Sequence, residues 1–162
     1  DFWQLKQEVA KLTAYRGNEP VKAADLDLLV TGKVPNDVFA LTDALGRRDL
    51  ATANKILLQQ LEQGARPEAL VGLIAWQLRT LAAVREALDS DNRNTSAQAL
   101  SDKLGIHKFV VSKALQQIPY YSADRLVLLY DSLSTLDVKL KTTQVEPKAL
   151  FGLFFSTLVG SR

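Results

Sequence analysis

The side chains that most often carry out catalysis or bind metals are scarce in this sequence. The chain has no cysteine and a single histidine, His107. Thiolate nucleophiles, cysteine-bound zinc, disulfides and multi-histidine metal sites are therefore excluded. Because histidine titrates near neutral pH, His107 is the one candidate general base. It follows Gly105 and Ile106 at an expected helix start, so we predict instead that it caps free backbone N–H groups or lies at the surface.

Recognisable sites for phosphate binding or carboxylate catalysis are also missing from the sequence. No glycine-rich loop ends in Gly-Lys-Ser or Gly-Lys-Thr, which is the usual cradle for nucleotide phosphates. The acidic pairs Asp25/Asp27 and Asp89/Asp91 fall in a short helix and in a loop, where solvated or capping roles are expected. The sequence therefore predicts a protein that is not an enzyme and needs no metal or cofactor.

Composition narrows the class of protein further. Hydrophobic residues make up 47% of the chain and charged residues 23%, which is typical of a folded globular domain. The net charge of +2 gives no strong case for binding nucleic acid or a membrane surface. No apolar run is long enough to span a membrane, and no signal segment opens the chain, so we expect a cytoplasmic protein. The absence of methionine and the start at Asp1 suggest an excised fragment.

Helical periodicity runs along the whole chain, and no segment has the alternating pattern of a strand. Two amphipathic helices are expected over about residues 2–15 and 23–30. The segment 31–35, Thr-Gly-Lys-Val-Pro, then breaks the pattern and predicts a domain boundary. We therefore divide the chain into a unit at 1–34 and a unit at 35–162.

The second unit predicts a helical bundle. Asp49 and Ser122 are expected N-caps, and Gly64 is expected in the left-handed conformation at a helix end. A helix that begins after Pro67 is apolar on all sides in its first half, so it should form the centre of the bundle. With the first unit, the fold class is all-α with about nine helices. In the second unit they are expected over about 36–46, 50–63, 68–88, 96–104, 107–118, 123–140 and 147–158.

Residues 96–118 have the spacing of a helix-turn-helix, with Gly105 in the turn. One interpretation is a DNA-binding regulator that reads sequence with the second helix. That helix, however, begins with Phe109, Val110 and Val111, whereas recognition helices present polar and basic side chains to the bases. A packed helical hairpin is the interpretation that the composition favours.

The last helix has a heavy aromatic face formed by Phe151, Phe154 and Phe155. These side chains suit a core. So much aromatic area near the end of a chain also suits a contact with another subunit. Both alternatives remain open from the sequence alone.

The order of several segments resembles one known family. Residues 5–17 (LKQEVAKLTAYRG) resemble its "E-x-x-K-L-x-x-Y-x-G" helix end, and residues 38–45 (VFALTDAL) resemble its string "F-x-L-x-D-A-L". A basic turn and an aspartate, at 47–49, follow as expected, and residues 104–113 (LGIHKFVVSK) complete the match. The chain thus resembles the C-terminal half of the delta subunit of the bacterial DNA polymerase III clamp loader, an AAA+ assembly.

This resemblance implies a role in assembly. Residues 1–34 would be the last helices of a small helical lid domain, and residues 35–162 the helical collar domain that holds a five-subunit ring together. Its partners would be the motor (gamma/tau) and delta-prime subunits, whereas the sliding clamp would be contacted only through an N-terminal domain outside this sequence.

The resemblance also suggests where the collar would meet other molecules. The collar would pack against neighbouring collars, with Phe151, Phe154 and Phe155 at the contact. Primer–template DNA lies inside the ring, so His107, Lys108 and Lys113 would approach it and bind weakly, without reading sequence.

Overall fold

The computed structural model describes residues 35–90 and 96–159, and the expected helices and domain boundary within 1–34 lie outside these residues. The described residues form seven α-helices and one short 3-10 helix, with no strand among them, so the all-α prediction is confirmed. The helices are α3 (Pro35–Gly46), α4 (Leu50–Glu62), α5 (Pro67–Ser90), α6 (Ala97–Leu104), α7 (Lys108–Gln117), η1 (Ile118–Tyr120), α8 (Ala123–Thr142) and α9 (Pro147–Val159).

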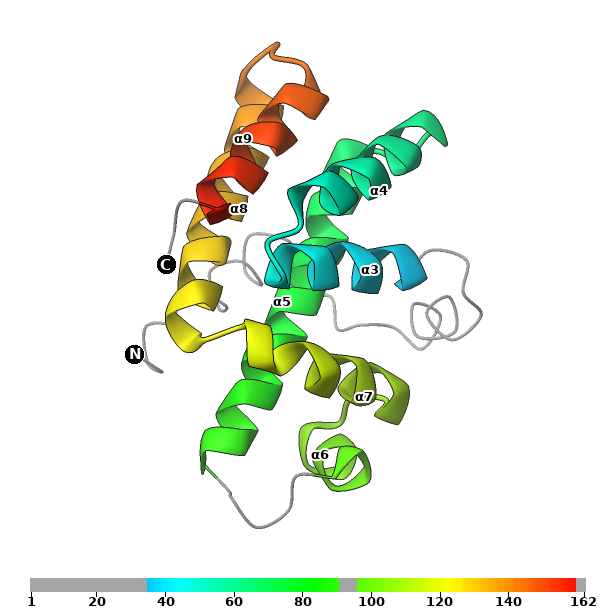
Figure 1. Ribbon diagram of the computed structural model, residues 1–162, viewed down its shortest axis with the longest axis vertical. Coiled ribbons are helices and arrows are strands. Elements are labelled where there is room, and N and C mark those ends of the chain that lie inside the picture. Colours follow the sequence, from blue (N-terminus) through cyan, green and yellow to red (C-terminus); the bar gives the residue numbers. More distant parts are fainter. Residues whose placement is uncertain (1–34, 91–95, 160–162) are drawn as a thin grey trace.

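Helix α5 is the centre of the bundle. It runs through the middle of the molecule, with α3, α7 and α8 packed around it, while α8 and α9 form an antiparallel hairpin along one side (Figure 1). The run Leu70–Leu78 is buried at nearly every position, as the all-round apolar sequence predicts. The position of α5 brings together the segments at 35–62 and 97–159, which are distant in sequence.

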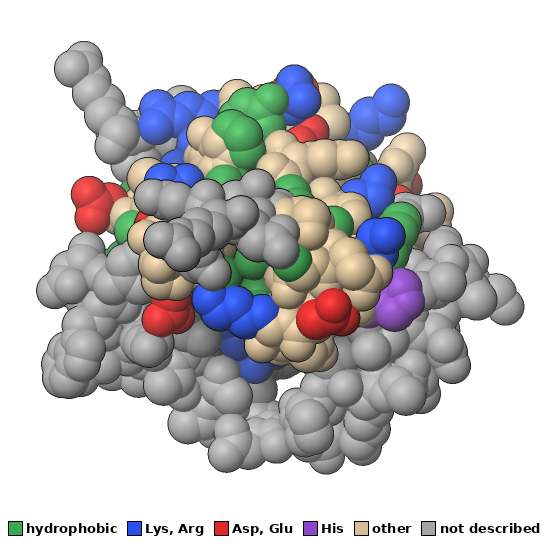
Figure 2. Space-filling view, turned by 90° about the horizontal axis from the view of Figure 1, so that it is seen from below, with side chains coloured by type: hydrophobic (Ala, Val, Ile, Leu, Met, Phe, Trp, Pro, Cys, Tyr) green, Lys and Arg blue, Asp and Glu red, His purple; other side chains and the backbone are tan. Residues whose placement is uncertain are grey.

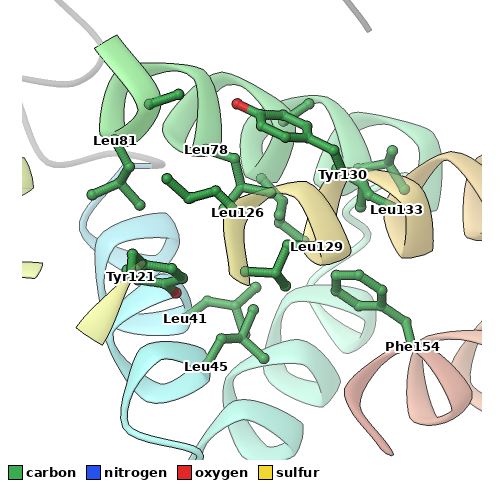
Figure 3. Packing of buried hydrophobic residues seen from close by; sticks show 14 of the residues in the cluster. Leu41, Leu45, Leu78, Leu81, Tyr121, Leu126, Leu129, Tyr130, Leu133 and Phe154 are labelled. Atoms are coloured by element: carbon green, nitrogen blue, oxygen red, sulfur yellow. The ribbon is translucent and has the colours of Figure 1, made fainter. Parts of the chain in front are cut away.

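The main core lies between α5, α8 and the shorter helices. Leu126, Leu129 and Leu133 of α8 point into it and pack with leucines of α3 and α5, and Phe154 of α9 closes one side (Figure 3). These side chains are between 0% and 3% exposed. Burying a leucine or phenylalanine side chain contributes about 1.5–3 kcal/mol, so this shared cluster is the main source of stability.

The helix ends follow the signals that the sequence carries. The Asp49 carboxylate accepts hydrogen bonds from the Thr52 N–H at 3.1 Å and the Thr52 hydroxyl at 2.6 Å, and these bonds lower the pKa of Asp49. The Ser122 hydroxyl accepts from the Arg125 N–H at 3.1 Å. Gly64 lies in the left-handed region with φ +90°, where glycine carries no steric penalty. All three cap predictions are confirmed.

The turn from α3 to α4 has the length that the sequence predicts, since α3 ends at Gly46 and α4 begins at Leu50. The Arg48 N–H donates to the Leu45 carbonyl and the Asp49 N–H to the Ala44 carbonyl, the paired bonds of a Schellman motif. Arg48 has φ +61° at the position where glycine is usual. A Cβ on Gly46 would lie 2.9 Å from the Tyr120 Cβ, so only glycine fits where α3 meets η1.

Candidate interaction surfaces

Side chains of one later segment, residues 117–125, donate several hydrogen bonds to the backbone of helix α3. Gln117 Nε2 donates to the Phe39 carbonyl at 2.8 Å, and the Tyr121 hydroxyl donates to the Thr42 carbonyl. Arg125 donates from Nη2 to the Leu45 carbonyl at 2.6 Å and from Nη1 to the Gly46 carbonyl at 2.9 Å. The last two bonds satisfy carbonyls that a helix end otherwise leaves unpaired. This segment, which we call the clasp, fixes the α6–α7 hairpin and α8 to α3.

A buried polar contact links helix α5 to the clasp. Gln117 Oε1 accepts from Gln77 Nε2 at 3.1 Å and lies 3.1 Å from the Thr42 hydroxyl. All three side chains are at most 3% exposed. The Gln77 Oε1 atom is buried without a hydrogen-bond partner in the described part of the chain. Because a polar group inside a core is costly unless it is bonded, the contact fixes one relative position of α3, α5 and α7.

Burial changes the acid–base properties of the side chains near the clasp. It raises the pKa of Tyr121 above its usual range, although the neighbouring Arg125 charge opposes the change. It also raises the pKa of Tyr130 on α8. Partial burial lowers the pKa of Arg125, whose guanidinium carbon lies 5.7 Å from the centre of the Tyr121 ring. Both tyrosines therefore remain neutral at physiological pH, and Tyr121 keeps its proton for the bond to α3.

His107 caps a helix, which is the first of the two roles predicted for it. Its Nδ1 atom accepts a hydrogen bond from the Phe109 N–H at 3.1 Å, at the start of α7. The turn before it is held by the Ser101 hydroxyl, which donates to the Ile106 carbonyl at 2.6 Å, and by Gly105 at φ +67°. The Nδ1 atom of the imidazole is thereby engaged with the backbone.

The α6–α7 hairpin presents one side of α7 to solvent and buries the other. Val110 and Val111 are fully buried, whereas Lys108 is exposed and Phe109 is 36% exposed. Lys113 Nζ lies 5.5 Å above the centre of the Phe109 ring. This burial agrees with the packed helical hairpin that the composition favours. The approach of His107, Lys108 and Lys113 to DNA stays a prediction.

The end of the molecule where α6 and α7 lie carries both signs of charge. Figure 2 views the molecule from this end and shows Lys and Arg side chains interspersed with Asp and Glu side chains. Asp102 and Lys103 of α6 are both exposed here. A protein that binds DNA tightly gathers its basic side chains into one area, so this surface suits at most a weak contact.

A small aromatic cluster supports the exposed Phe109. The Phe39 ring centre lies 6.0 Å from that of Phe109, in an edge-to-face arrangement, and 6.3 Å from that of Trp76. Trp76 is 9% exposed, so it lies in the core, as its place in an apolar helix predicts. The cluster holds the start of α7 against α3 and α5.

The three aromatic residues predicted at a subunit contact lie in the core of this chain. Phe151, Phe154 and Phe155 are between 0% and 3% exposed, and the Phe154 and Phe155 ring centres lie 5.7 Å apart. Their place in a subunit contact stays a prediction. Leu153, between them in sequence, is 56% exposed.

The residues that connect the helices were not found by sequence reasoning. Gln77, Gln117 and Arg125 each form hydrogen bonds to groups far away in the chain. Leu153 is exposed, but its sequence neighbours are all apolar or glycine, so the sequence did not distinguish it from the buried residues. One signal was present: Gln77 is the only uncharged polar residue in the apolar stretch from Ala69 to Leu78. A polar side chain on a helix expected to be buried on all sides must find a buried partner.

Other kinds of site find no support in the described residues. No group of three or more histidine, cysteine, aspartate or glutamate side chains is placed to hold a metal ion in residues 35–90 and 96–159. Within the same residues, no helix has the length and apolar character needed to cross a bilayer.

The described residues form an all-α bundle whose side chains are used for packing and for hydrogen bonds between helices. Comparisons with known proteins identify the family of this domain. The family "DNA polymerase III delta subunit, C-terminal domain" matches residues 35–158. The chain belongs to this family, as its resemblance predicts.

A sequence and a solved structure from Bacillus subtilis show the same relationship. The DNA polymerase III subunit delta is 24% identical over 154 residues, which cover 94% of this chain and 44% of that protein. The solved structure of the DNA clamp loader delta protein matches with a TM-score of 0.68 and 25% identity, covering 96% of this chain and 45% of that one. The chain therefore spans less than half the length of these relatives.

Proposed function

We propose that this chain is a non-catalytic assembly module of the bacterial DNA polymerase III clamp loader. It packs against the collars of neighbouring subunits and so helps to hold the ring that loads the sliding clamp onto primed DNA during replication. The observation that carries this proposal is the family match over residues 35–158. In this proposal residues 35–162 are the collar domain and residues 1–34 are the end of the lid domain.

The described structure supports a mechanical role. The shared core and the clasp tie α3, α5, α7 and α8 into one body. An assembly domain needs this stiffness, because a change in one subunit reaches the next only through parts that do not deform. Motor (gamma/tau) and delta-prime subunits are the proposed partners, in the cytoplasm. The sliding clamp is contacted through an N-terminal domain that this sequence does not include, and no cofactor is required.

A weak contact with primer–template DNA is a secondary part of the proposal. His107 and Lys108 lie at the exposed tip between α6 and α7, and Lys113 lies one turn further along α7. They would contact phosphates within the assembled ring. The alternative, a sequence-reading regulator, is less well supported, because α7 buries Val110 and Val111 and the surrounding surface has mixed charge.

The experiment is to mix the chain with intact motor and delta-prime subunits from the same organism. The mass of the mixture is then measured by light scattering behind a sizing column. We expect a stable complex that contains this chain. If the folded chain elutes alone at tens of micromolar, the proposal is wrong.

A duplex-DNA titration at low and high salt separates the alternative function. Tight binding by the chain alone, with a steep loss of affinity as salt rises, would instead identify a DNA-binding regulator.

A further inference from the structure

Exposed hydrophobic side chains gather on the α8–α9 hairpin. Among the residues that the structure describes, four large hydrophobic side chains are exposed, and three of them belong to this hairpin. Val138 lies on α8 and is 48% exposed, Val145 lies in the turn at 50%, and Leu153 lies on α9 at 56%. Single exposed hydrophobic side chains are ordinary, but Leu153 also lines a groove on this hairpin.

The hairpin also carries a groove. It has a volume of about 240 Å³ and lies between the outer sides of α8 and α9. Leu136, Leu150 and Phe154 are its buried apolar lining, and Leu153 stands exposed beside them. The remaining lining residues are Ser132, Thr135, Lys139 and Thr157. Helices pack by placing the side chains of one into the grooves of another, so a groove on two helices suits a third helix.

The charge on the groove selects the kind of partner. Among the described residues that line it, Lys139 is charged and none is acidic. The nearest carboxylate in sequence, Asp137, is paired with Lys141 at 3.1 Å. A partner with an aspartate or glutamate beside its apolar side chain would therefore complement the groove.

We infer that the α8–α9 groove is the surface on which a helix of a neighbouring clamp-loader subunit docks. That helix would place an aliphatic or aromatic side chain beside Leu153 and a carboxylate against Lys139. The inference rests on the proposed function and adds which face of the domain makes the contact. A symmetric contact between two copies of this chain is disfavoured, because it would bring the Lys139 side chains of both copies into one interface.

The test measures the affinity of the chain for the motor and delta-prime subunits, with the chain labelled for fluorescence anisotropy. Leu153→Asp places a charge in the apolar contact, and we expect it to weaken binding by at least about tenfold, as for the centre of an interface. Leu153→Ala removes the side chain without adding charge, and Lys139→Glu reverses the charge of the groove. Both should weaken binding severalfold.

Matched control variants lie on α6, away from the α8–α9 hairpin. Gln98→Asp adds a carboxylate at an exposed position, as Leu153→Asp does, and Lys103→Glu makes the Lys139 change at another exposed lysine. Both controls should bind within about twofold of the parent chain, since rim or remote charges contribute little to affinity. Thermal unfolding of every variant confirms that each is folded.

Each outcome supports or overturns a specific claim. If the parent chain does not bind, the proposed function fails. If the parent chain binds and both Leu153→Ala and Lys139→Glu bind equally well, the groove is not the docking surface. A homodimer of the parent chain that Leu153→Asp dissociates, without any effect on the hetero-complex, would show that a second copy occupies the groove and would overturn the inference.

Discussion

Two buried tyrosines differ in whether the hydroxyl has a partner. The Tyr121 hydroxyl donates to the Thr42 carbonyl, whereas the Tyr130 hydroxyl is buried with no hydrogen-bond partner in the described part of the chain. Tyr121→Phe should lower the free energy of unfolding by about 0.5–1.5 kcal/mol, the net contribution of one hydrogen bond. Tyr130→Phe should leave it unchanged or raise it, because only an unpaired polar group is removed. Urea unfolding of the two variants makes the comparison, and equal losses would contradict this account.

The same tyrosines predict how stability depends on pH. Burial raises the pKa of both in the folded chain, while tyrosines in an unfolded chain titrate near pH 10. Above about pH 10 the unfolded state has therefore lost protons that the folded state still holds, so stability must fall as pH rises. The stability from these groups is complete below pH 10.

Urea unfolding between pH 8 and pH 11 measures this dependence. In Tyr121→Phe the decline should be shallower than in the parent chain, since one titrating group is gone. An identical slope in the two proteins would show that Tyr121 does not contribute.

Local signals at single residues were readable from the sequence. Asp49, Ser122 and His107 cap the helix that begins directly after each, so the donor and acceptor are at most three residues apart. Gln77 and Gln117 could not be paired in this way, because they are 40 positions apart and meet only after the helices have packed. Interactions within one turn are set by the sequence, whereas interactions across the core depend on the fold.

At the scale of elements, two helical glycines have opposite surroundings. A Cβ on Gly46 would lie 2.9 Å from both Tyr120 Cβ and Tyr121 Cε2, whereas a Cβ on Gly152 would meet nothing within 4 Å. Gly46→Ala should destabilise the chain by about 1–3 kcal/mol through overpacking, which outweighs the gain in helix propensity. Gly152→Ala should stabilise it by about 0.5–1 kcal/mol, because alanine loses less entropy in a helix.

Thermal unfolding of the two alanine variants checks this prediction. Their melting temperatures should move in opposite directions from that of the parent chain. A rise for both variants would show that the contact between α3 and the Tyr120–Tyr121 segment is loose.

The hydrophobic pattern of helix α9 does not show which of its sides is buried. Its sequence is apolar on nearly every side, so the pattern did not separate the buried Phe151 and Phe155 from the exposed Leu153. Helix α8 alternates leucines with polar residues, and Leu126, Leu129, Leu133 and Leu136 all lie on its buried face. An amphipathic helix shows which side faces the core, whereas an apolar helix at the edge of a bundle shows this only in the folded structure.

At the scale of the whole molecule, the sequence was sufficient for the fold class and for the family. Leucine-rich helical periodicity, few glycines and ordered motifs along 5–113 led to an all-α bundle and to the delta-subunit resemblance. The faces that meet other subunits could not be predicted, because core and interface helices have the same composition. The structure shows which apolar side chains are buried among the described residues, and three of the four large ones left exposed there belong to the α8–α9 hairpin.

The central claim, that this chain assembles a clamp loader, is tested most directly by competition. Loading of the sliding clamp onto primed DNA is measured in a reaction reconstituted from separate subunits, with increasing amounts of this chain added before assembly. As an assembly module without the rest of the subunit, the chain should occupy the place of intact delta and inhibit loading, and excess intact delta should restore it. Unchanged loading in a large excess of the folded chain would contradict the account.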